Sequence, residues 1–337
     1  MAVFTLHSKI SIGNFKPFKG VHDISIKKSL GDYADTAILK LPLTARLKQA
    51  GSPQTQSVLT AHQFNVGDKV VIELGYNNKL EREFVGFIRR INMTTPLEIE
   101  CEGYAYQLRA KKINKSWKET SLTEVLEYLI EGTDIVIAYT NEVKVEDLVF
   151  QDETAFSALG KIKDNMHINV WFDENKLYAG LKYSYYTARQ KEAKPDVLYK
   201  IGHNTINAND IKRTLDKEEK KVTAIYKDKD GTEIRESYGT GLIEEEIKVD
   251  NIRNSGDLFH LAKNEVEKEK AKDWEGKIET FLVPFCKPGY KMRIEDARYP
   301  ERTGNYIVES VDTRFGLGGG RRTVEISYEI LTIDYIN

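Results

Sequence analysis

Hydrophobic and polar positions alternate in short runs along the first hundred residues, with turn residues between the runs. This alternation is the pattern of half-buried β-strands. The runs that predict strands are residues 3–12, 22–26, 36–41, 70–74, 84–91 and 97–108. Short strands at this spacing favour a small barrel or sandwich. We therefore predict a β-barrel domain over residues 1–108, with its best-marked part at Phe64 to Leu108.

The pattern of Phe64 to Leu108 returns near the C-terminus, in Pro284 to Ile330. The matches lie 222 residues apart (289 − 67): Gly67 with Gly289, Lys69 with Lys291, Ile72 with Ile294, and Phe84-Val85-Gly86 with Tyr306-Ile307-Val308. With an offset three residues larger, Ile99-Glu100 meets Val324-Glu325. Two copies indicate a duplicated domain rather than a solenoid. We predict a second, similar β-barrel domain over residues 196–337.

Between these two regions the hydrophobic period becomes helical. Ser121 and Glu124 have the spacing of a capping box, and apolar residues recur every three or four positions from Leu122 to Ile130. A second helix is predicted at 154–165, followed by a hairpin over 167–183. Residues 109–195 are therefore predicted to form an α/β middle domain.

The third region begins with strands and contains one long helix. Val222 to Tyr226 and Thr232 to Tyr238 flank a turn and predict a hairpin. Ser255 is predicted to cap a helix that runs to Lys272, and Gly276 to Val283 is predicted to be a strand. The fold class that follows is α+β and mainly β, with two similar small β-barrels, an α/β insert and one long helix before the second barrel motif.

Residues 43–65 have no clear hydrophobic period. The segment is polar, and we expect a long exposed loop there. Loops of this length are uncommon unless they are functional or disordered. Gln54 and Gln56 in this loop are candidate partner contacts.

Charge and cysteine content exclude several classes of protein. Lys and Arg number 50 against 52 Asp and Glu, a net charge of −2 in 337 residues, so no electrostatic footprint for nucleic acid is present. Cys101 and Cys286 lie in apolar surroundings and are expected to be buried thiols. The N-terminus has no signal-peptide pattern, and no apolar run approaches the ~20 residues of a membrane span. We expect synthesis in the cytoplasm without membrane insertion.

Candidate chemistry is sparse in this sequence. The six histidines are scattered without metal-ligand spacing, and no nucleophile-elbow motif is present. No two of the acidic residues are singled out as a catalytic pair. We expect no catalytic residues, metal or cofactor. Gly316 to Gly320 is followed by a strand instead of a helix, which favours a hairpin tip over a phosphate cradle. Gly318, Arg321 and Arg322 of this tip are candidate partner contacts.

Several short motifs, taken in order, resemble a known family. They are Phe64-x-x-Gly67-Asp68-x-Val70-x-Ile72, Gly75-Tyr76, Phe84-x-Gly86-x-Ile88, Pro96-x-x-Ile99-x-Cys101-Glu102, and Pro284-x-x-x-Pro288-Gly289 followed by Gly304-x-Tyr306-x-Val308. The helix Leu122 to Ile130, the segment Phe150 to Leu177 and the helix Ser255 to Lys272 add to the likeness. The chain resembles tail-hub proteins of contractile-tailed phages, the late control protein D family, which is related to the barrel region of type VI secretion spike proteins.

The resemblance implies a non-enzymatic structural hub of a phage or prophage baseplate. Such a hub is a homotrimer whose two barrels per subunit form a six-barrel ring. The ring joins the six-fold tail tube to the three-fold spike, so the implied partners are copies of the chain itself, the tube protein and the spike protein. The implied location is the virion tail baseplate, assembled in the bacterial host cytoplasm. The tail 332–337 is a further candidate contact.

Two other functions remain open at this point. One is a tail-associated cell-wall hydrolase, although we expect no room for such a domain because Asn337 follows the second barrel directly. The other is a carbohydrate-binding β-module, which an exposed aromatic strip would favour. Trp117, Trp171 and Trp274 are instead spread over different predicted elements.

Overall fold

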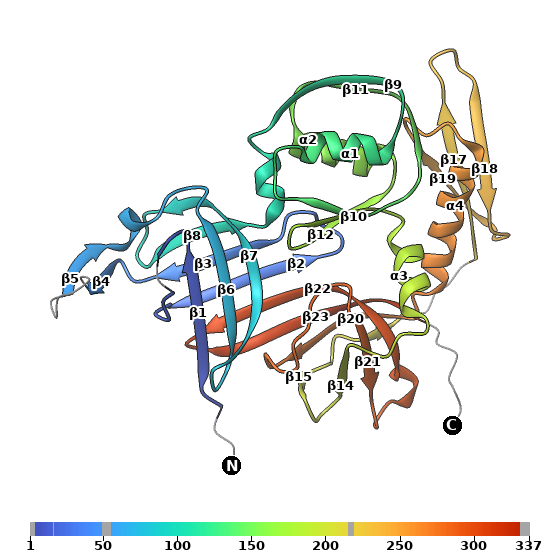
Figure 1. Ribbon diagram of the computed structural model, residues 1–337. Helices are drawn as coiled ribbons and strands as arrows, with labels where there is room; N and C mark the ends of the chain where they lie inside the picture. The colour runs from blue at the N-terminus through green and yellow to red at the C-terminus, as the bar shows by residue number, and fades with distance from the viewer. Residues whose placement is uncertain (1–3, 16, 49–54, 215–218, 331–337) are drawn as a thin grey trace.

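Strands dominate the computed structural model, which describes residues 4–15, 17–48, 55–214 and 219–330 (Figure 1). The strands are β1 (Leu6–Ile12), β2 (Asp23–Ser29), β3 (Thr36–Leu41), β4 (Thr44–Lys48), β5 (Thr55–Leu59), β6 (Lys69–Tyr76), β7 (Lys79–Asn92), β8 (Leu97–Glu102), β9 (Lys112–Ser121), β10 (Val136–Thr140), β11 (Lys144–Thr154), β12 (Asn169–Asp173), β13 (Lys176–Gly180), β14 (Val197–Lys200), β15 (Thr205–Asn207), β16 (Lys212–Arg213), β17 (Lys220–Lys227), β18 (Glu233–Tyr238), β19 (Ile243–Lys248), β20 (Trp274–Thr280), β21 (Lys291–Glu295), β22 (Gly304–Gly316) and β23 (Gly319–Glu329). The helices are α1 (Leu122–Ile130), α2 (Ala155–Asn165), α3 (Lys182–Gln190) and α4 (Ser255–Lys270), with short 3₁₀ turns at Thr60–Gln63, Tyr104–Leu108 and Pro300–Arg302. The predicted class, α+β and mainly β, is confirmed.

One 13-stranded sheet contains both β-rich regions. Its first half-sheet has the order β1-β6-β7-β8-β3-β2, and β2 then pairs with β22. The second half-sheet continues β22-β23-β20-β15, with β21 and β14 alongside β22 and with β16 beside β20. Among the described strands neither half-sheet closes on itself, because β2 pairs with β22 instead of returning to β1. The expected closed barrels are therefore not found, and the two regions are continuous.

Each half-sheet buries one set of alternating side chains. In the first half-sheet Ile10, Ile24 and Leu39 are completely buried, together with Ile72 of β6. The second has a separate core that includes Ile278, Met292 and Val308. Gly86 is required inside β7, since a Cβ there would lie 2.2 Å from the carbonyl oxygen of Glu102 on β8.

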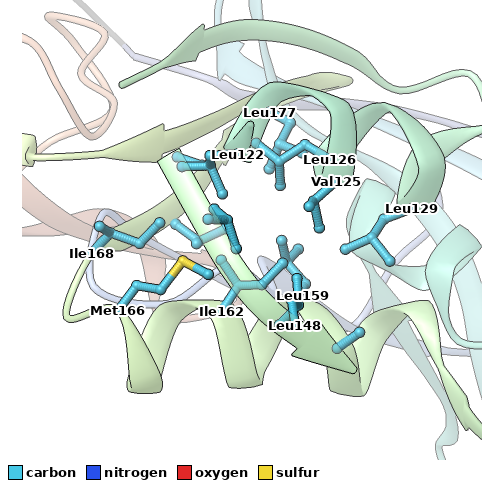
Figure 2. Packing of buried hydrophobic residues seen from close by; sticks show 14 of the residues in the cluster. Leu122, Val125, Leu126, Leu129, Leu148, Leu159, Ile162, Met166, Ile168 and Leu177 are labelled. Carbon is cyan, nitrogen blue, oxygen red and sulfur yellow. The ribbon is translucent and has the colours of Figure 1, made fainter. Parts of the chain in front are cut away.

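Residues 109–195 form a layer on one side of this sheet, which we call the middle layer. The ribbon of β9 and β11 arches over α1 and α2 (Figure 1), and the apolar faces of both helices meet in a common core (Figure 2). The capping box of α1 is confirmed, because the Ser121 hydroxyl accepts from the Glu124 amide at 3.2 Å. Thr154 caps α2 in a similar way. The predicted hairpin forms as β12 and β13.

Two features of the region after residue 180 differ from expectation. Helix α3 was not predicted, and it falls where the sequence favoured the end of a strand. Asn254, not Ser255, caps α4, because its side-chain oxygen accepts from the Asp257 amide at 3.1 Å.

Strand β19 pairs with β17, so the acidic run Glu244 to Glu246 belongs to a sheet edge. The residues that α4 and β17 bury join the same core as α1 and α2.

Within residues 43–65, where a long loop was expected, the described residues include two paired strands. Strands β4 and β5 pair only with each other, from Thr44 opposite Leu59 to Lys48 opposite Thr55. We call these two strands the arm. It projects from the first half-sheet (Figure 1). Ala45 and Val58 lie opposite each other and are half-buried, which gives the arm one partly covered face.

Candidate assembly surfaces

The described residues hold no cluster of His, Cys, Asp and Glu that could bind a metal ion. No described helix has the length and apolarity that crossing a bilayer requires. A pocket of about 640 Å³ lies where α3 faces α4, and Ser184, Asp257 and His260 all line it. The Ser184 hydroxyl donates to the side-chain oxygen of Asn264 at 2.9 Å. In the described part of the chain no hydrogen bond joins Ser184 to His260, so these residues do not form a nucleophile–base pair.

Both cysteines are buried free thiols, as expected. Burial raises the pKa of the Cys286 thiol to about 12, and it also raises the pKa of Cys101. A nucleophilic cysteine needs the opposite shift, because the thiolate is the reactive form. Neither residue is placed for catalysis.

The junction between the half-sheets is a continuous hydrogen-bond ladder. Strand β2 lies antiparallel to β22, from Asp23 opposite Gly316 to Ser29 opposite Ser310. At one end of the junction the Tyr76 hydroxyl donates to the carbonyl oxygen of Gly320 at 3.2 Å. The two half-sheets are thus joined by backbone pairing as well as by side chains.

Arg322 lies inside this junction and has no exposed surface. Its guanidinium forms an ion pair with Glu83 of β7, which is 4% exposed. It also donates to the carbonyl oxygens of Leu282 at 2.6 Å and Pro284 at 2.9 Å. Burial raises the pKa of Glu83, and the charge of Arg322 opposes that shift. The sequence placed Arg322 at an exposed tip, but the residue is fully buried and its two Nη atoms donate within the chain, so we do not retain it as a contact residue.

The other candidate contacts lie on two separate elements. Gly318 is at the turn between β22 and β23, next to Leu317, which is 98% exposed. Arg321 is half-buried, with its guanidinium 5.1 Å from the ring centre of Phe281. This tip lies beside β1, whereas the arm that carries the exposed Gln56 projects elsewhere (Figure 1). Gln54 and the tail 332–337 lie outside the described residues.

Several strand edges of the main sheet lack a partner strand in the described part of the chain: β14, for example, pairs with β21 only, and two further open edges lie on β7 and at β15 and β16. Strand β7 pairs with β6 only as far as Phe87, opposite Lys69, while β8 follows its other side to Asn92. The side of β7 beyond Ile88 therefore has no partner strand. The second open edge is at the far end of the sheet, where β15 and β16 pair with β20 on one side only.

Comparison with known proteins places the fold among phage tail proteins. No protein-family model and no curated protein sequence matches the chain. A tail protein from Neisseria meningitidis MC58 superposes with a TM-score of 0.65 at 14% identity, over 96% of both chains. The 43 kDa tail protein of prophage MuSo2 from Shewanella oneidensis gives 0.65 at 13% identity, over 96% of this chain and 98% of that one.

A more distant likeness extends to a type VI secretion component. That protein, from E. coli, is described as structurally similar to T4 bacteriophage tail proteins. It superposes with a TM-score of 0.54 at 10% identity, over 95% of this chain and 76% of that chain. At these identities the comparisons establish the fold: the chain has the architecture of phage tail proteins and of a type VI secretion component.

Proposed function

We propose that the chain is a structural hub of the baseplate of a contractile-tailed phage or prophage, of the late control protein D type. The observation that carries the proposal is the fold it shares, over nearly its whole length, with two phage tail proteins. The hub sits in the virion tail and is assembled in the bacterial cytoplasm. Its partners are further copies of the chain, the tail tube protein and the spike protein.

The two half-sheets are the repeated units of this hub, and we attribute them to an internal duplication. Their strand orders support this. The order β14-β21-β22-β23-β20-β15 in the second half-sheet repeats the order β1-β6-β7-β8-β3-β2 of the first, strand for strand. Both copies also have a register shift at the same place, between Ile88 and Arg90 in one and between Val308 and Ser310 in the other. The copies differ at β14, which pairs parallel to β21, whereas β1 is antiparallel to β6.

A trimer of such chains matches two symmetries at once. Three subunits with two similar half-sheets each present six similar units to a six-fold tube and three identical ones to a three-fold spike. Contacts around such a ring are head-to-tail, and they close when the rotation per subunit completes a circle. The arm, Gly318 and Arg321 are our candidates for tube or spike contacts.

A catalytic role has no support from the site geometry. The pocket between α3 and α4 lacks a hydrogen-bonded nucleophile and base within the described residues. A carbohydrate-binding role needs an exposed aromatic platform, but Trp171 is only 1% exposed and Trp117 packs against Tyr128 and Phe150. The structural role is therefore the better supported one.

The test is the assembly state together with activity. Native mass spectrometry and sedimentation of the purified chain are expected to give a trimer across the micromolar range. A monomer at every concentration contradicts the hub proposal. Release of soluble fragments from peptidoglycan by the same preparation would favour the hydrolase instead.

A further inference from the structure

The unpaired side of β7 and the unpaired edge at β15 and β16 are complementary sites on one chain. We propose that, in the assembled hub, β16 of one subunit pairs with the free side of β7 beyond Ile88, at Arg90 to Asn92, in the next subunit. This inference rests on the proposed trimer and adds the surface through which it forms. Its occupant is a second copy of this chain.

The pairing of β2 with β22 inside the chain is the template for the proposed contact between subunits. Strand β22 has β23 along one side, while its other side is shared by β21 at the start and β2 at the end. Strand β7 has the same surroundings with one strand missing. Its start pairs with β6 and its other side with β8, but no described strand occupies the position that β2 takes beside β22. Because β7 ends at Asn92, this vacancy corresponds to the Lys27 to Ser29 end of β2.

Paired residues fix how β7 and β22 correspond. Lys69 is opposite Phe87 on β7, and its counterpart Lys291 is opposite Ile307 on β22. Phe87 therefore corresponds to Ile307, and counting onward Asn92 corresponds to Asp312. The register shifts of the two strands coincide in this numbering. The backbone around the shift also repeats, because Ile88 donates to the Asp68 carbonyl as Val308 does to that of Tyr290.

The strand equivalent to β2 is the split strand β15 and β16. Strand β2 lies beside β3, which pairs with β8, and β15 lies beside β20, which pairs with β23. Following these ladders, Lys212 on β16 takes the position of Lys27 on β2. The side of β2 that faces away from β3 is paired with β22. The corresponding side of β15 and β16, facing away from β20, is unpaired among the described residues. The edge at β16 can thus act as the donor and the free side of β7 as the acceptor.

The expected register follows from the internal junction. Lys27 is opposite Asp312, so Lys212 is expected opposite Asn92 of the neighbouring subunit. The Asn92 amide donates to Glu98 at 3.0 Å and to Glu100 at 2.8 Å, which places two carboxylates beside the position that Lys212 would reach. Opposite charges across strands stabilise pairing. The exposed Lys212 would thus lie near Glu98 and near Glu100, which also lies 3.7 Å from Arg90.

Exposed apolar side chains border both edges. Met93, directly after β7, is 76% exposed, and Ile206 of β15 is 40% exposed. Pairing of β16 with β7 would bring the neighbouring chain beside Met93, whereas Ile206 lies past the end of β7 in this register. Unpaired edges are also aggregation sites, and adding a strand from another chain removes the exposed backbone groups. Because the donor and acceptor edges differ, the contact is head-to-tail and generates a ring.

The first test replaces an apolar residue at the proposed seam. Met93→Asp is expected to shift the trimer towards monomer by at least about tenfold in the assembly constant, since a buried unpaired charge is costly. The matched control is Leu242→Asp, whose side chain is 100% exposed between β18 and β19, and it should leave assembly unchanged. Circular dichroism checks that both variants fold. Equal assembly of Met93→Asp and wild type would overturn the proposed seam.

The second test uses a disulfide across the seam. Residues directly opposite on antiparallel strands have Cα atoms about 4.5–5.5 Å apart, which is within disulfide range. The variant with Asn92→Cys and Lys212→Cys is expected to give covalent dimers and trimers after mild oxidation. Asn92→Cys combined with Leu242→Cys should not. A trimer by sedimentation that never cross-links refutes this seam but leaves the hub proposal standing, whereas a wild-type chain that stays monomeric removes the hub proposal as well.

Discussion

The buried pair of Arg322 and Glu83 offers a sharp test of how the half-sheets are held together. Replacing Arg322 by Leu leaves the Glu83 carboxylate in a site where it is only 4% exposed and has lost its cation. Removing one partner of a buried ion pair typically costs about 3–5 kcal/mol. The same change takes the donors away from the carbonyl oxygens of Leu282 and Pro284. We expect Arg322→Leu to lower the free energy of unfolding by at least about 3 kcal/mol.

The assay is urea unfolding followed by circular dichroism, with two comparison variants. Arg321→Leu changes the neighbouring, half-buried arginine and is expected to cost below about 1 kcal/mol, because it loses a contact with Phe281 and one hydrogen bond to the adjacent Gly320 carbonyl, and no buried ion pair. Adding Glu83→Leu to Arg322→Leu removes the uncompensated carboxylate and should recover part of the loss. If Arg322→Leu costs no more than Arg321→Leu, the pair does not hold the junction and the reasoning is refuted.

Three further predictions concern titration, thiol reactivity and the core of the middle layer. Burial raises the pKa of Asp35 to about 7 from 3.8, so the native state binds this proton more tightly and stability falls as pH rises from about 4 to about 7. Asp35→Asn should weaken that dependence and be more stable than wild type at pH 8, measured as Tm; an unchanged pH profile would contradict it. Cys101 and Cys286 should not react with a thiol reagent until urea unfolds the protein, and rapid native labelling would show that they are accessible. Leu126→Ala should cost about 2–5 kcal/mol, while a loss below about 1 kcal/mol would mean that the site repacks freely.

The local signals in the sequence predicted α1 to the residue. The helix has a capping box at Ser121 and a clear apolar stripe, and both depend only on neighbours within the same segment. Helix α3 has neither signal. Its N-cap residue Leu181 makes no side-chain cap, and its run of tyrosines packs against other aromatic rings rather than forming an aliphatic stripe. The packing that specifies α3 comes from distant segments.

The hydrogen-bonded ladders align the two half-sheets differently from the internal sequence match in one strand. The sequence paired Phe84 with Tyr306, whereas the ladders pair Ile72 with Phe84 and Ile294 with Gly304. Phe84 therefore corresponds to Gly304, two residues earlier. A slip of two leaves every side chain on the same face of the sheet, so alternation cannot detect it. Only the hydrogen-bonded register resolves it.

The candidate contacts were the least predictable part. Arg322 follows a glycine-rich turn, and in the sequence it is indistinguishable from the adjacent Arg321. Its partner Glu83 is 239 residues away, so only the folded sheet shows that one arginine is buried and the other is not. The open edges of β7 and β15 carry no residue signature at all, because an unpaired strand is defined by what lies beside it.

The antiparallel pairing of β2 with β22 also has a mechanical consequence. A force that pulls the half-sheets apart along the strand direction loads all the hydrogen bonds of this ladder in parallel, as shear. A force across the strands would break them one after another, like a zipper. The molecule should therefore be stiff along one axis and weaker along the perpendicular one. A protein that must transmit a thrust would benefit from having its strong axis aligned with the load.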